Sequence, residues 1–353
     1  MTLATRLLIF VLTSLFCSLS FSAPTKSWES VMKAGAIAYQ RADYADAKRQ
    51  WNEAMRIADS FPSSDQRIDK SLSALASLAH ETSDFPEAER LYLRLIARRQ
   101  ELSGPNDLAL ASDLVNLGYI YKAQHKLSLA EPLFVRVVSI KEMALGPKNP
   151  EVGLSLTSLA LVYLAERQYG KAEATAKKAL SLFQNTLDPD HPHIAGAVSN
   201  LGMIYFEQGK FDEAEPLMQK SLRIREKTLG REHPDVSASL NNLGAVYYEQ
   251  RKFDQCEPLY TRALAIREKA LGPQHPDVAE SLYNLAKLRQ ATTNYADAES
   301  LYMRALAIKE QRPPFENPNV VHVLDDFARL LRLRGRVYQA ERVERRARNV
   351  IAP

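Results

Sequence analysis

Apolar side chains follow the three- and four-residue spacing of a helix in two runs within residues 231–272. Those of the first run are Val236, Leu240, Leu243, Val246 and Tyr247, and those of the second are Leu259, Tyr260, Ala263, Leu264 and Ile266. The polar stretch EQRKFD separates the two runs. Its counterpart EQGKFD, residues 207–212, places Gly209 where a helix C-terminus favours a left-handed residue. The pattern therefore predicts a helix, a turn and a second helix.

This unit recurs with a period of 42 residues, in blocks that begin at residues 105, 147, 189, 231, 273 and 315 and align without a gap. Blocks 189–230 and 231–272 are identical at 21 of 42 positions. A single helix pair cannot bury its apolar face alone, so tandem copies are expected to stack into a solenoid.

The tetrapeptide HPDV opens two of the blocks, at 233–236 and 275–278, and related tetrapeptides open others: NPEV (149–152), HPHI (191–194) and NPNV (317–320). His and Asn can cap a helix, proline suits its first turn, and an acidic residue favours its N-terminal dipole. A metal site or a J-domain motif is the alternative. Because asparagine replaces histidine in two blocks and successive copies lie about 10 Å apart, we interpret the motif as a helix start.

Two segments carry a family resemblance: SNLGMIYFEQGKFDEAEPLMQKSLRIREKTLG (199–230) and NNLGAVYYEQRKFDQCEPLYTRALAIREKALG (241–272). They resemble the tetratricopeptide repeat (TPR), in the 42-residue form found in kinesin light chains. Residues 38–57 and 78–97 look like two divergent copies, so the resemblance covers about residues 28–350. It implies an all-α helix–turn–helix solenoid, a right-handed superhelix of about seven to eight repeats.

The repeats predict the domain organisation: two divergent repeats in 24–104, five regular repeats in 105–314, and a partial, arginine-rich capping repeat in 315–353. The chain departs from the family pattern in two ways. No heptad coiled coil precedes the repeats, so pairing with a kinesin heavy chain is not implied. Arg289 stands where other copies have Tyr121, Tyr163, Tyr205 or Tyr247, so packing in the seventh repeat is expected to differ.

The first helices of stacked pairs are expected to line a concave groove. An asparagine recurs there in mid-helix, where it costs up to about 0.7 kcal/mol of helix propensity, at Asn116, Asn200, Asn242 and Asn284. Its carboxamide could bind the backbone of an extended peptide, as groove asparagines do in the family, or it could fix the stacking of repeats. The same geometry adds Tyr119, Lys122, Met203, Phe206, Tyr248, Tyr283 and Lys287 to the peptide-binding candidates, with packing against a neighbouring helix as the alternative.

The last block contains eight arginines: Arg329, Arg332, Arg334, Arg336, Arg342, Arg345, Arg346 and Arg348. A terminal repeat needs a polar outer face, so a solvated cap is one interpretation. The other is a site for an anionic partner such as an acidic lipid, an envelope polyanion or an acidic protein, with Arg329, Arg332, Arg345 and Arg346 as candidates. Aromatic residues scarcely alternate with these arginines, so nucleic-acid binding is not expected.

At the N-terminus, Arg6 precedes the apolar run LLIFVLTSLFCSLSF (7–21), and the small residues Ser22 and Ala23 follow. About 15 apolar residues are too few for a spanning helix, which needs roughly 20, so residues 1–23 predict a cleaved signal peptide; a retained anchor is the alternative. Cleavage would remove Arg6 and no acidic residue, taking the formal charge from +4 to +3. The sequence thus predicts an exported protein, periplasmic or secreted, without a transmembrane segment after cleavage.

Enzyme motifs are missing from the sequence: there is no glycine-rich phosphate loop, GxSxG, HExxH or paired CxxC. Cys256 replaces the alanine of other copies, which indicates a small buried residue and not a nucleophile. We therefore expect no catalytic residues, metal or cofactor. The sequence predicts a scaffold that binds a protein or peptide in its groove; the alternatives are an envelope-surface protein that uses its C-terminal arginines and, third, an enzyme with a dispersed site.

Overall fold

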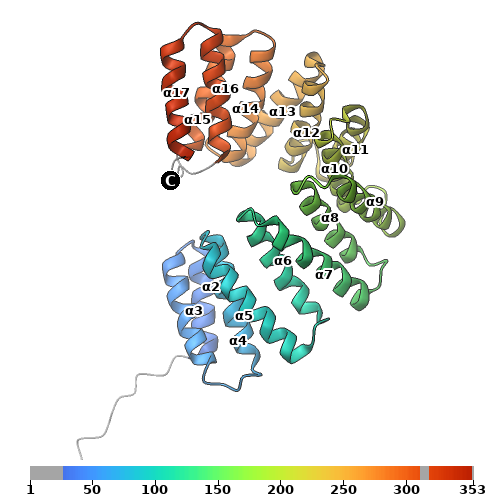
Figure 1. Cartoon of the computed structure of the whole chain (residues 1–353), viewed down its shortest axis with the longest axis vertical. Helices are drawn as coiled ribbons and strands as arrows, with labels where there is room; N and C mark the ends of the chain where they lie inside the picture. Colours follow the sequence, from blue (N-terminus) through green and yellow to red (C-terminus); the bar gives the residue numbers. More distant parts are fainter. Residues whose placement is uncertain (1–26, 311–317, 352–353) are drawn as a thin grey trace, which may run out of the picture. The chain divides into compact units, whose positions relative to one another are not determined.

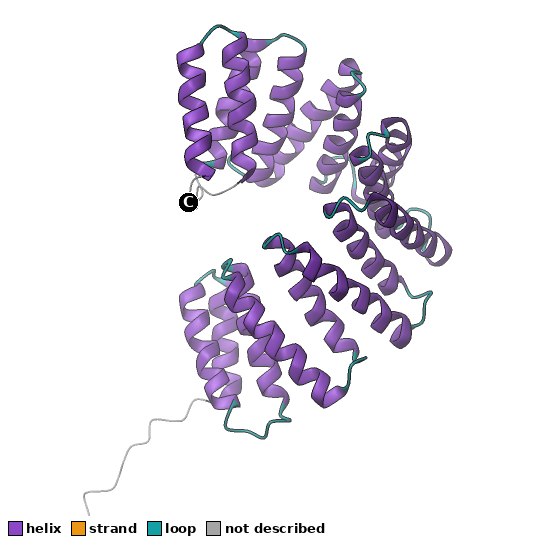
Figure 2. Cartoon of the chain, in the orientation of Figure 1, coloured by secondary structure: helices purple, strands orange, loops and turns teal. Residues whose placement is uncertain are grey.

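The computed structural model describes residues 27–310 and 318–351, and these contain sixteen helices and no strand (Figures 1 and 2). The helices follow one another as helix–turn–helix pairs, which confirms the predicted all-α solenoid fold. The chain forms two compact units, Met1–Lys126 and Leu127–Pro353. None of the helices in the described ranges is both long and apolar enough to cross a bilayer. The predicted signal segment lies outside the described residues.

The first unit contains five helices: α2 (Trp28–Gln40), α3 (Tyr44–Ala58), α4 (Gln66–Glu81), α5 (Phe85–Ser103) and α6 (Leu108–Ala123). The second unit contains eleven: α7 (Leu127–Leu145), α8 (Pro150–Ala165), α9 (Tyr169–Thr186), α10 (Pro192–Glu207), α11 (Phe211–Leu229), α12 (Pro234–Glu249), α13 (Phe253–Leu271), α14 (Pro276–Ala291), α15 (Tyr295–Lys309), α16 (Pro318–Leu333) and α17 (Val337–Ile351).

The HPDV tetrapeptides begin helices, as predicted. Nδ1 of His233 accepts a hydrogen bond from the backbone N–H of Asp235 at 3.2 Å, and His275 does the same for Asp277. In the NPEV block, Oδ1 of Asn149 accepts the equivalent bond at 2.9 Å. Each cap residue is extended, so the imidazole ring serves as a helix cap. Asn317, the other expected asparagine cap, lies outside the described residues.

Replacing His233 with asparagine should therefore change the free energy of unfolding by less than about 1 kcal/mol, because the carboxamide can accept the same bond. Pro234→Gly should lower the free energy of unfolding by more than that exchange, because glycine gives the backbone at the first residue of α12 more conformational freedom in the unfolded chain. Urea denaturation followed by circular dichroism would measure both changes. A loss of several kcal/mol, or of a bound metal, in His233→Asn would contradict the capping role.

The turn inside each pair contains one left-handed residue at a repeated position. At Gly209, φ is +73°, as the sequence predicts, but the same place is taken by Arg251 at +59°, Arg167 at +56° and His125 at +58°. Side chains with a Cβ are disfavoured there. The fold thus imposes this conformation even where the sequence offers no glycine.

Core clusters of the second unit extend over more than one repeat. Leu243 and Val246 of α12 are buried, and they pack in one cluster with Met218 of α11, Tyr260 of α13 and Leu285 of α14. Because each first helix contacts the second helix before it and the one after it, burial couples neighbouring pairs. The apolar positions that predicted the helices are thus the positions that stack them.

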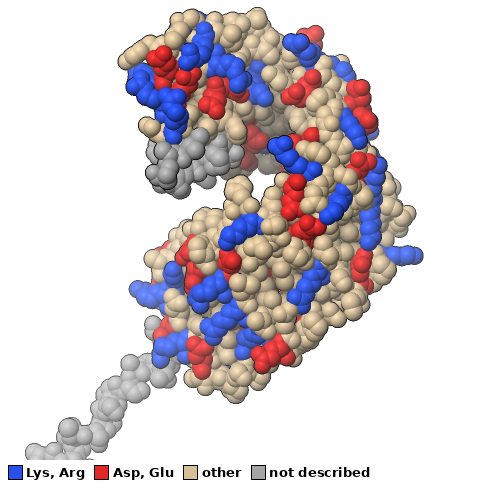
Figure 3. Space-filling model, in the orientation of Figure 1, with Lys and Arg blue, Asp and Glu red and all other residues tan. Residues whose placement is uncertain are grey.

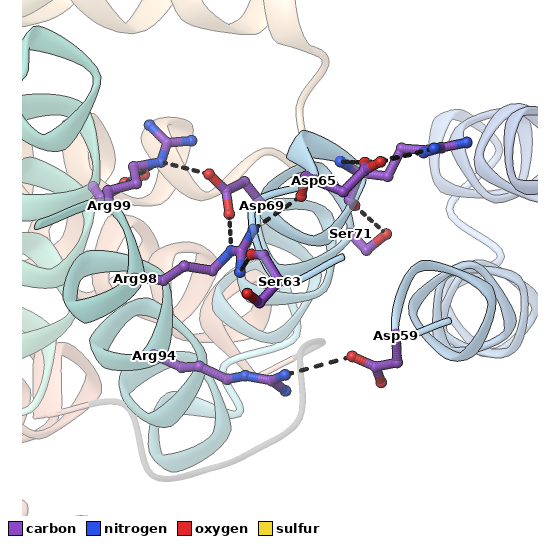
Figure 4. Close-up of polar contacts among 10 residues, drawn as sticks. Asp59, Ser63, Asp65, Asp69, Ser71, Arg94, Arg98 and Arg99 are labelled. Carbon is purple, nitrogen blue, oxygen red and sulfur yellow. Dashed lines mark hydrogen bonds and ion pairs between the residues drawn. The ribbon is translucent and has the colours of Figure 1, made fainter. Parts of the chain in front are cut away.

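In the first unit, three arginines hold the connection between α3 and α4 (Figure 4). Arg94 lies 3.6 Å from Asp59, and Arg98 donates to the carbonyl of Asp65 at 2.9 Å and also pairs with Asp69. Arg67 lies over the ring of Phe61, 3.4 Å from its centroid. These contacts fix a seven-residue connection, 59–65, that is longer than the four residues between α7 and α8.

Candidate functional site

The first helices of the second unit's later pairs, α10, α12, α14 and α16, neighbour one another in order (Figure 1). Asn200, Asn242 and Asn284 occupy the same position in three of them, and each is half-buried. Each of these residues is thus neither fully enclosed nor fully exposed. The structure therefore repeats one hydrogen-bonding group on successive helices; we call Asn200, Asn242 and Asn284 the asparagine row.

One member of the asparagine row also contacts the preceding repeat. The amide nitrogen of Asn242 lies 3.5 Å from the hydroxyl oxygen of Ser199 on α10, a long hydrogen bond. A separate, fully buried residue, Asn241, donates to Ser281 on α14 at 3.1 Å. The stacking role is thus carried more strongly by Asn241, and at Asn242 the structure shows a weak stacking contact beside a surface position.

Met203, Phe206 and Tyr248 lie along the same helices and are partly buried against the core. The ring of Phe206 meets Phe211 edge-on, with centroids 5.4 Å apart, and Tyr248 lies 5.8 Å from Phe253. Each aromatic residue thus packs on the second helix of its own pair. Since they remain half-exposed, they offer apolar surface that is held rigidly in place.

On α14 and α16, the helices that follow α12 in this series, charged side chains lie beside the asparagine row. Nζ of Lys287 lies 5.0 Å from the ring centroid of Tyr248 and 5.8 Å from that of Tyr283, and the hydroxyl of Tyr283 donates to Asp326 at 2.7 Å. Burial, followed by the hydrogen bond to Asp326, raises the pKa of Tyr283. Asp326 stands at the asparagine position of α16 and pairs with Arg329 at 2.8 Å. The contacts join α12, α14 and α16.

The remaining peptide-binding candidates, Asn116, Tyr119 and Lys122, lie on α6 in the first unit. Tyr119 is 39% exposed, and Nζ of Lys122 lies 5.8 Å from its ring centroid. Burial raises the pKa of Tyr92, while hydrogen bonds with Ser77 and Asn116 partly lower it. Asn116 thus has a partner within its own unit.

The four arginines grouped as an anion site are divided between two helices: Arg329 and Arg332 are on α16, and Arg345 and Arg346 are on α17. Arg329 and Arg332 stand at the positions of Lys287 and Gln290 one repeat earlier, so they extend the first-helix face. Arg332 binds Glu344 with two bonds of 2.8 and 2.9 Å, and Arg346 pairs with Glu310. Only Arg345 of the four has no carboxylate partner among the described residues.

Arg346 belongs to a ladder of ion pairs between second helices. Equivalent pairs, with partners 36 residues apart, join Lys178 to Glu142 at 2.9 Å, Arg262 to Glu226 at 2.5 Å and Arg304 to Glu268 at 2.5 Å. The basic residue recurs every 42 residues from Arg94 to Arg346. This recurrence was visible in the sequence, and it assigns Arg346 to stacking.

Packing in the seventh repeat was expected to differ at Arg289, and the structure shows one stacking contact replaced by another. In the repeat before, Lys252 lies 5.6 Å from the ring centroid of Tyr247 and pairs with Glu215 at 2.8 Å. Arg289 reaches Glu257, the equivalent acid, directly at 2.6 Å. The positive charge that binds the acid is thus supplied by Arg289, at the position where other repeats have tyrosine. Neighbouring repeats therefore remain linked by an ion pair.

A buried or half-buried basic residue at the end of several second helices was missed by sequence reasoning. Arg225 donates to Ser239 at 2.6 Å, and Arg267, only 7% exposed, donates to Ser237 at 3.1 Å, to Ser281 at 3.0 Å and to the carbonyl of Asp277 at 2.7 Å. In the first unit, Arg99 is the equivalent residue near the end of α5, and it lies 3.2 Å from Asp113 on the next helix, α6. The available signal was a basic residue beside apolar neighbours at one position of the 42-residue period, present as Arg99, Lys141, Arg225, Arg267 and Lys309 and replaced between these only by Phe183.

The side chains on these surfaces are ones that can bind a partner. They offer amide groups, partly exposed aromatic rings and a few charges, and within residues 27–310 and 318–351 no three His, Cys, Asp or Glu side chains cluster as metal ligands. Cys256 is buried, as predicted, and burial raises the pKa of its thiol to about 12. A protonated, enclosed thiol is a poor nucleophile.

A family model described as tetratricopeptide repeat matches residues 67–143, 114–185, 193–255 and 235–311, together more than half of the chain. The chain belongs to the tetratricopeptide repeat family. TPR proteins bind protein partners and are typically not catalytic, so the chain has the fold of an interaction scaffold. No curated protein matches the sequence.

Among solved structures, BtubC (BKLC) from P. vanneervenii is 26% identical over 69% of this chain and 93% of its own, with a TM-score of 0.54. Kinesin light chain-like TPR repeats from Podosopora anserina are 26% identical over 59% of this chain and 96% of theirs, with a TM-score of 0.50. RapI shares the fold at 16% identity, with a TM-score of 0.61 over 78% of this chain and 96% of its own. The predicted resemblance to kinesin light chain-like TPR proteins is confirmed.

Proposed function

We propose that this TPR protein is a scaffold that binds an extended segment of a protein partner along α10, α12 and α14. The observation that carries the proposal is the asparagine row, which repeats a half-buried carboxamide at one position of three neighbouring first helices. Met203, Phe206 and Tyr248 add partly exposed apolar surface beside it. Amide groups beside anchored aromatic side chains are typical of surfaces that bind peptides.

The spacing of the asparagine row suits an extended chain. Packed helices lie about 10 Å apart, and an extended chain advances about 3.3 Å per residue, so every third backbone amide would meet a carboxamide. Each carboxamide can donate and accept, as a peptide backbone requires. The ligand would then run across the helices, with its apolar side chains against Phe206 and Tyr248.

Replacing Asn200 and Asn242 together with alanine should weaken a captured partner about 5-fold to 150-fold, equivalent to about 1–3 kcal/mol, because buried backbone groups of the ligand would lose their partners. The free energy of unfolding should change little, since the hydrogen bond from Asn242 to Ser199 in the preceding repeat is long, 3.5 Å. Calorimetric titration with a partner captured from the native envelope would measure the affinity, and denaturation would measure the stability.

The matched control is the charge reversal Arg345→Glu with Arg346→Glu on α17. It should reduce this affinity far less than the alanine pair, and moderate salt should leave the affinity largely intact. If the alanine pair unfolds the protein while the charge reversal abolishes binding, the asparagine row is structural and the partner binds at α17.

We further propose that the protein is exported to the periplasm or secreted, supported by the order of charged, apolar and small residues in 1–23. The mature chain should then begin at residue 23 or 24. Intact-mass measurement of natively exported protein checks this, and a mass that includes residues 1–22 would show a retained anchor. In either case we propose that the protein acts by binding and carries out no chemical reaction.

A further inference from the structure

The positive charge of this protein is concentrated at its C-terminal end. Residues 325–350 contain eight arginines and four acidic residues, a net charge of +4, which equals the formal net charge of all 353 residues. The positive and negative charges in the rest of the chain therefore cancel. Figure 3 shows Lys and Arg side chains gathered over the surface formed by α17, with a few acidic side chains among them.

Most of these arginines are neutralised within the fold. Arg334 and Arg336 both pair with Glu299, and Arg329, Arg332 and Arg346 each have the carboxylate described above. Arg342, Arg345 and Arg348 have no carboxylate within ion-pair distance among the described residues. Of these, Arg342 and Arg345 line a shallow, open cleft of about 320 Å³ on α17, together with Tyr338, Arg346 and Asn349.

The turn that precedes this cleft exposes apolar side chains. Leu333 at the end of α16 is 58% exposed, Val337 at the start of α17 is 47% exposed, and Tyr338 is 70% exposed, which is the largest value among the exposed large apolar residues of the described chain. A solvated cap would not need these residues, since polar side chains cover an end face at lower cost. Apolar and unpaired basic residues thus occupy the same end of the last repeat.

The residues of this surface are particular to the last repeat. One period earlier, the positions of Tyr338, Arg342, Arg345 and Asn349 are occupied by the uncharged residues Ala296, Ser300, Met303 and Ala307. Arg346, in contrast, stands at a position that is basic in every repeat from Arg94 onward. The repeat pattern therefore separates Arg342 and Arg345 from the arginines that stack helices.

We propose that the end of the last repeat, formed by Leu333, Val337, Tyr338, Arg342 and Arg345, docks on an anionic lipid surface. Apolar side chains and tyrosine favour the boundary between headgroups and acyl chains, and basic residues bind the acidic headgroups. Weak membrane association becomes stable when an apolar and an electrostatic contribution are combined. Exposed apolar residues at a turn, flanked by unpaired arginines, favour a lipid surface over an acidic protein. This function goes beyond peptide binding on the first helices and does not depend on it.

The test is co-sedimentation of the full chain with vesicles of phosphatidylcholine alone or of equal parts phosphatidylcholine and phosphatidylglycerol. Binding to the anionic vesicles should be tighter, and Arg342→Gln with Arg345→Gln should weaken it about 30-fold at low ionic strength, since each basic residue near such a surface contributes about 1 kcal/mol. Leu333→Ser with Tyr338→Ser should also weaken it. The apolar run 7–21 is present in every variant, so the differences report the C-terminal end alone.

The matched control is Arg49→Gln with Arg56→Gln, which removes the same charge from exposed positions on α3. It should change anionic-vesicle binding less than threefold if the site is local, and thermal melts should confirm that all variants are folded. Equal binding of parent and Arg342/Arg345 variant to anionic vesicles overturns the proposal. So does equal binding of the parent to neutral and anionic vesicles, which would leave an acidic protein as the partner.

Discussion

Arg267→Ala is expected to lower the free energy of unfolding by about 3 kcal/mol, because it removes the centre of a buried hydrogen-bond network between repeats. The guanidinium group binds Ser237, Ser281 and the carbonyl of Asp277, and so joins α13 to both α12 and α14. Removing it leaves buried polar groups without a partner and opens a cavity at the contact. In a solenoid, whose stability depends on neighbour contacts, both interfaces should weaken.

Arg304→Ala is the matched control, because Arg304 is also a second-helix arginine that bonds the preceding repeat but has a side chain 44% exposed. An exposed ion pair contributes about 0–1 kcal/mol, so this variant should lose no more than that. Urea denaturation of both variants, followed by circular dichroism, gives the comparison. An equal loss in the two variants would show that burial of Arg267 adds nothing to stacking.

Asp113→Asn is expected to remove a pH dependence from the stability of the first unit. Asp113 is 4% exposed, and burial raises the pKa of its carboxyl to about 6, although Arg99 lowers it; Asp69 and Asp107 raise it further. Because the folded state holds the proton more tightly than the unfolded state, this group stabilises the fold at low pH. Its contribution falls by about 3 kcal/mol as the pH rises from about 4 to above 6.

Asparagine has no proton to lose, so the variant should gain stability relative to the parent by about that amount between pH 4 and pH 8. Urea denaturation of both proteins across this range gives the difference, in which the other titrating groups cancel. A difference that stays constant with pH would mean that Asp113 remains ionised throughout, held by its pair with Arg99 at 3.2 Å.

Local features of the sequence were sufficient to predict the helices. The cap at His233 and the apolar run Val236, Leu240, Leu243 depend on neighbours within one or two turns, and the structure confirms them. The 42-residue period then placed equivalent residues on equivalent helices. The fold class followed because each repeat imposes the same packing on the next.

Contacts between repeats could not be derived in the same way, since they depend on which side chains of two separate helices meet. The arginines of the last block look alike in sequence, yet Arg329 extends the first-helix face, Arg346 is a rung of the ion-pair ladder, and Arg345 is unpaired among the described residues. The partner of Arg289 could not be named from the sequence, because Glu257 lies 32 residues earlier in the chain, in another helix. Periodicity suggests such pairs, but distances are needed to identify them.

Site-specific photo-crosslinking tests most directly where a partner binds. A photoreactive amino acid would replace Met203 on α10, which lies beside the asparagine row, and, as the control, Thr261, an exposed residue of α13. Irradiation in cells that produce the protein should join a partner to position 203, and the Asn200→Ala, Asn242→Ala background should reduce that product strongly. Crosslinks that form equally well at position 261, or that persist unchanged in the alanine background, would contradict binding along the first helices.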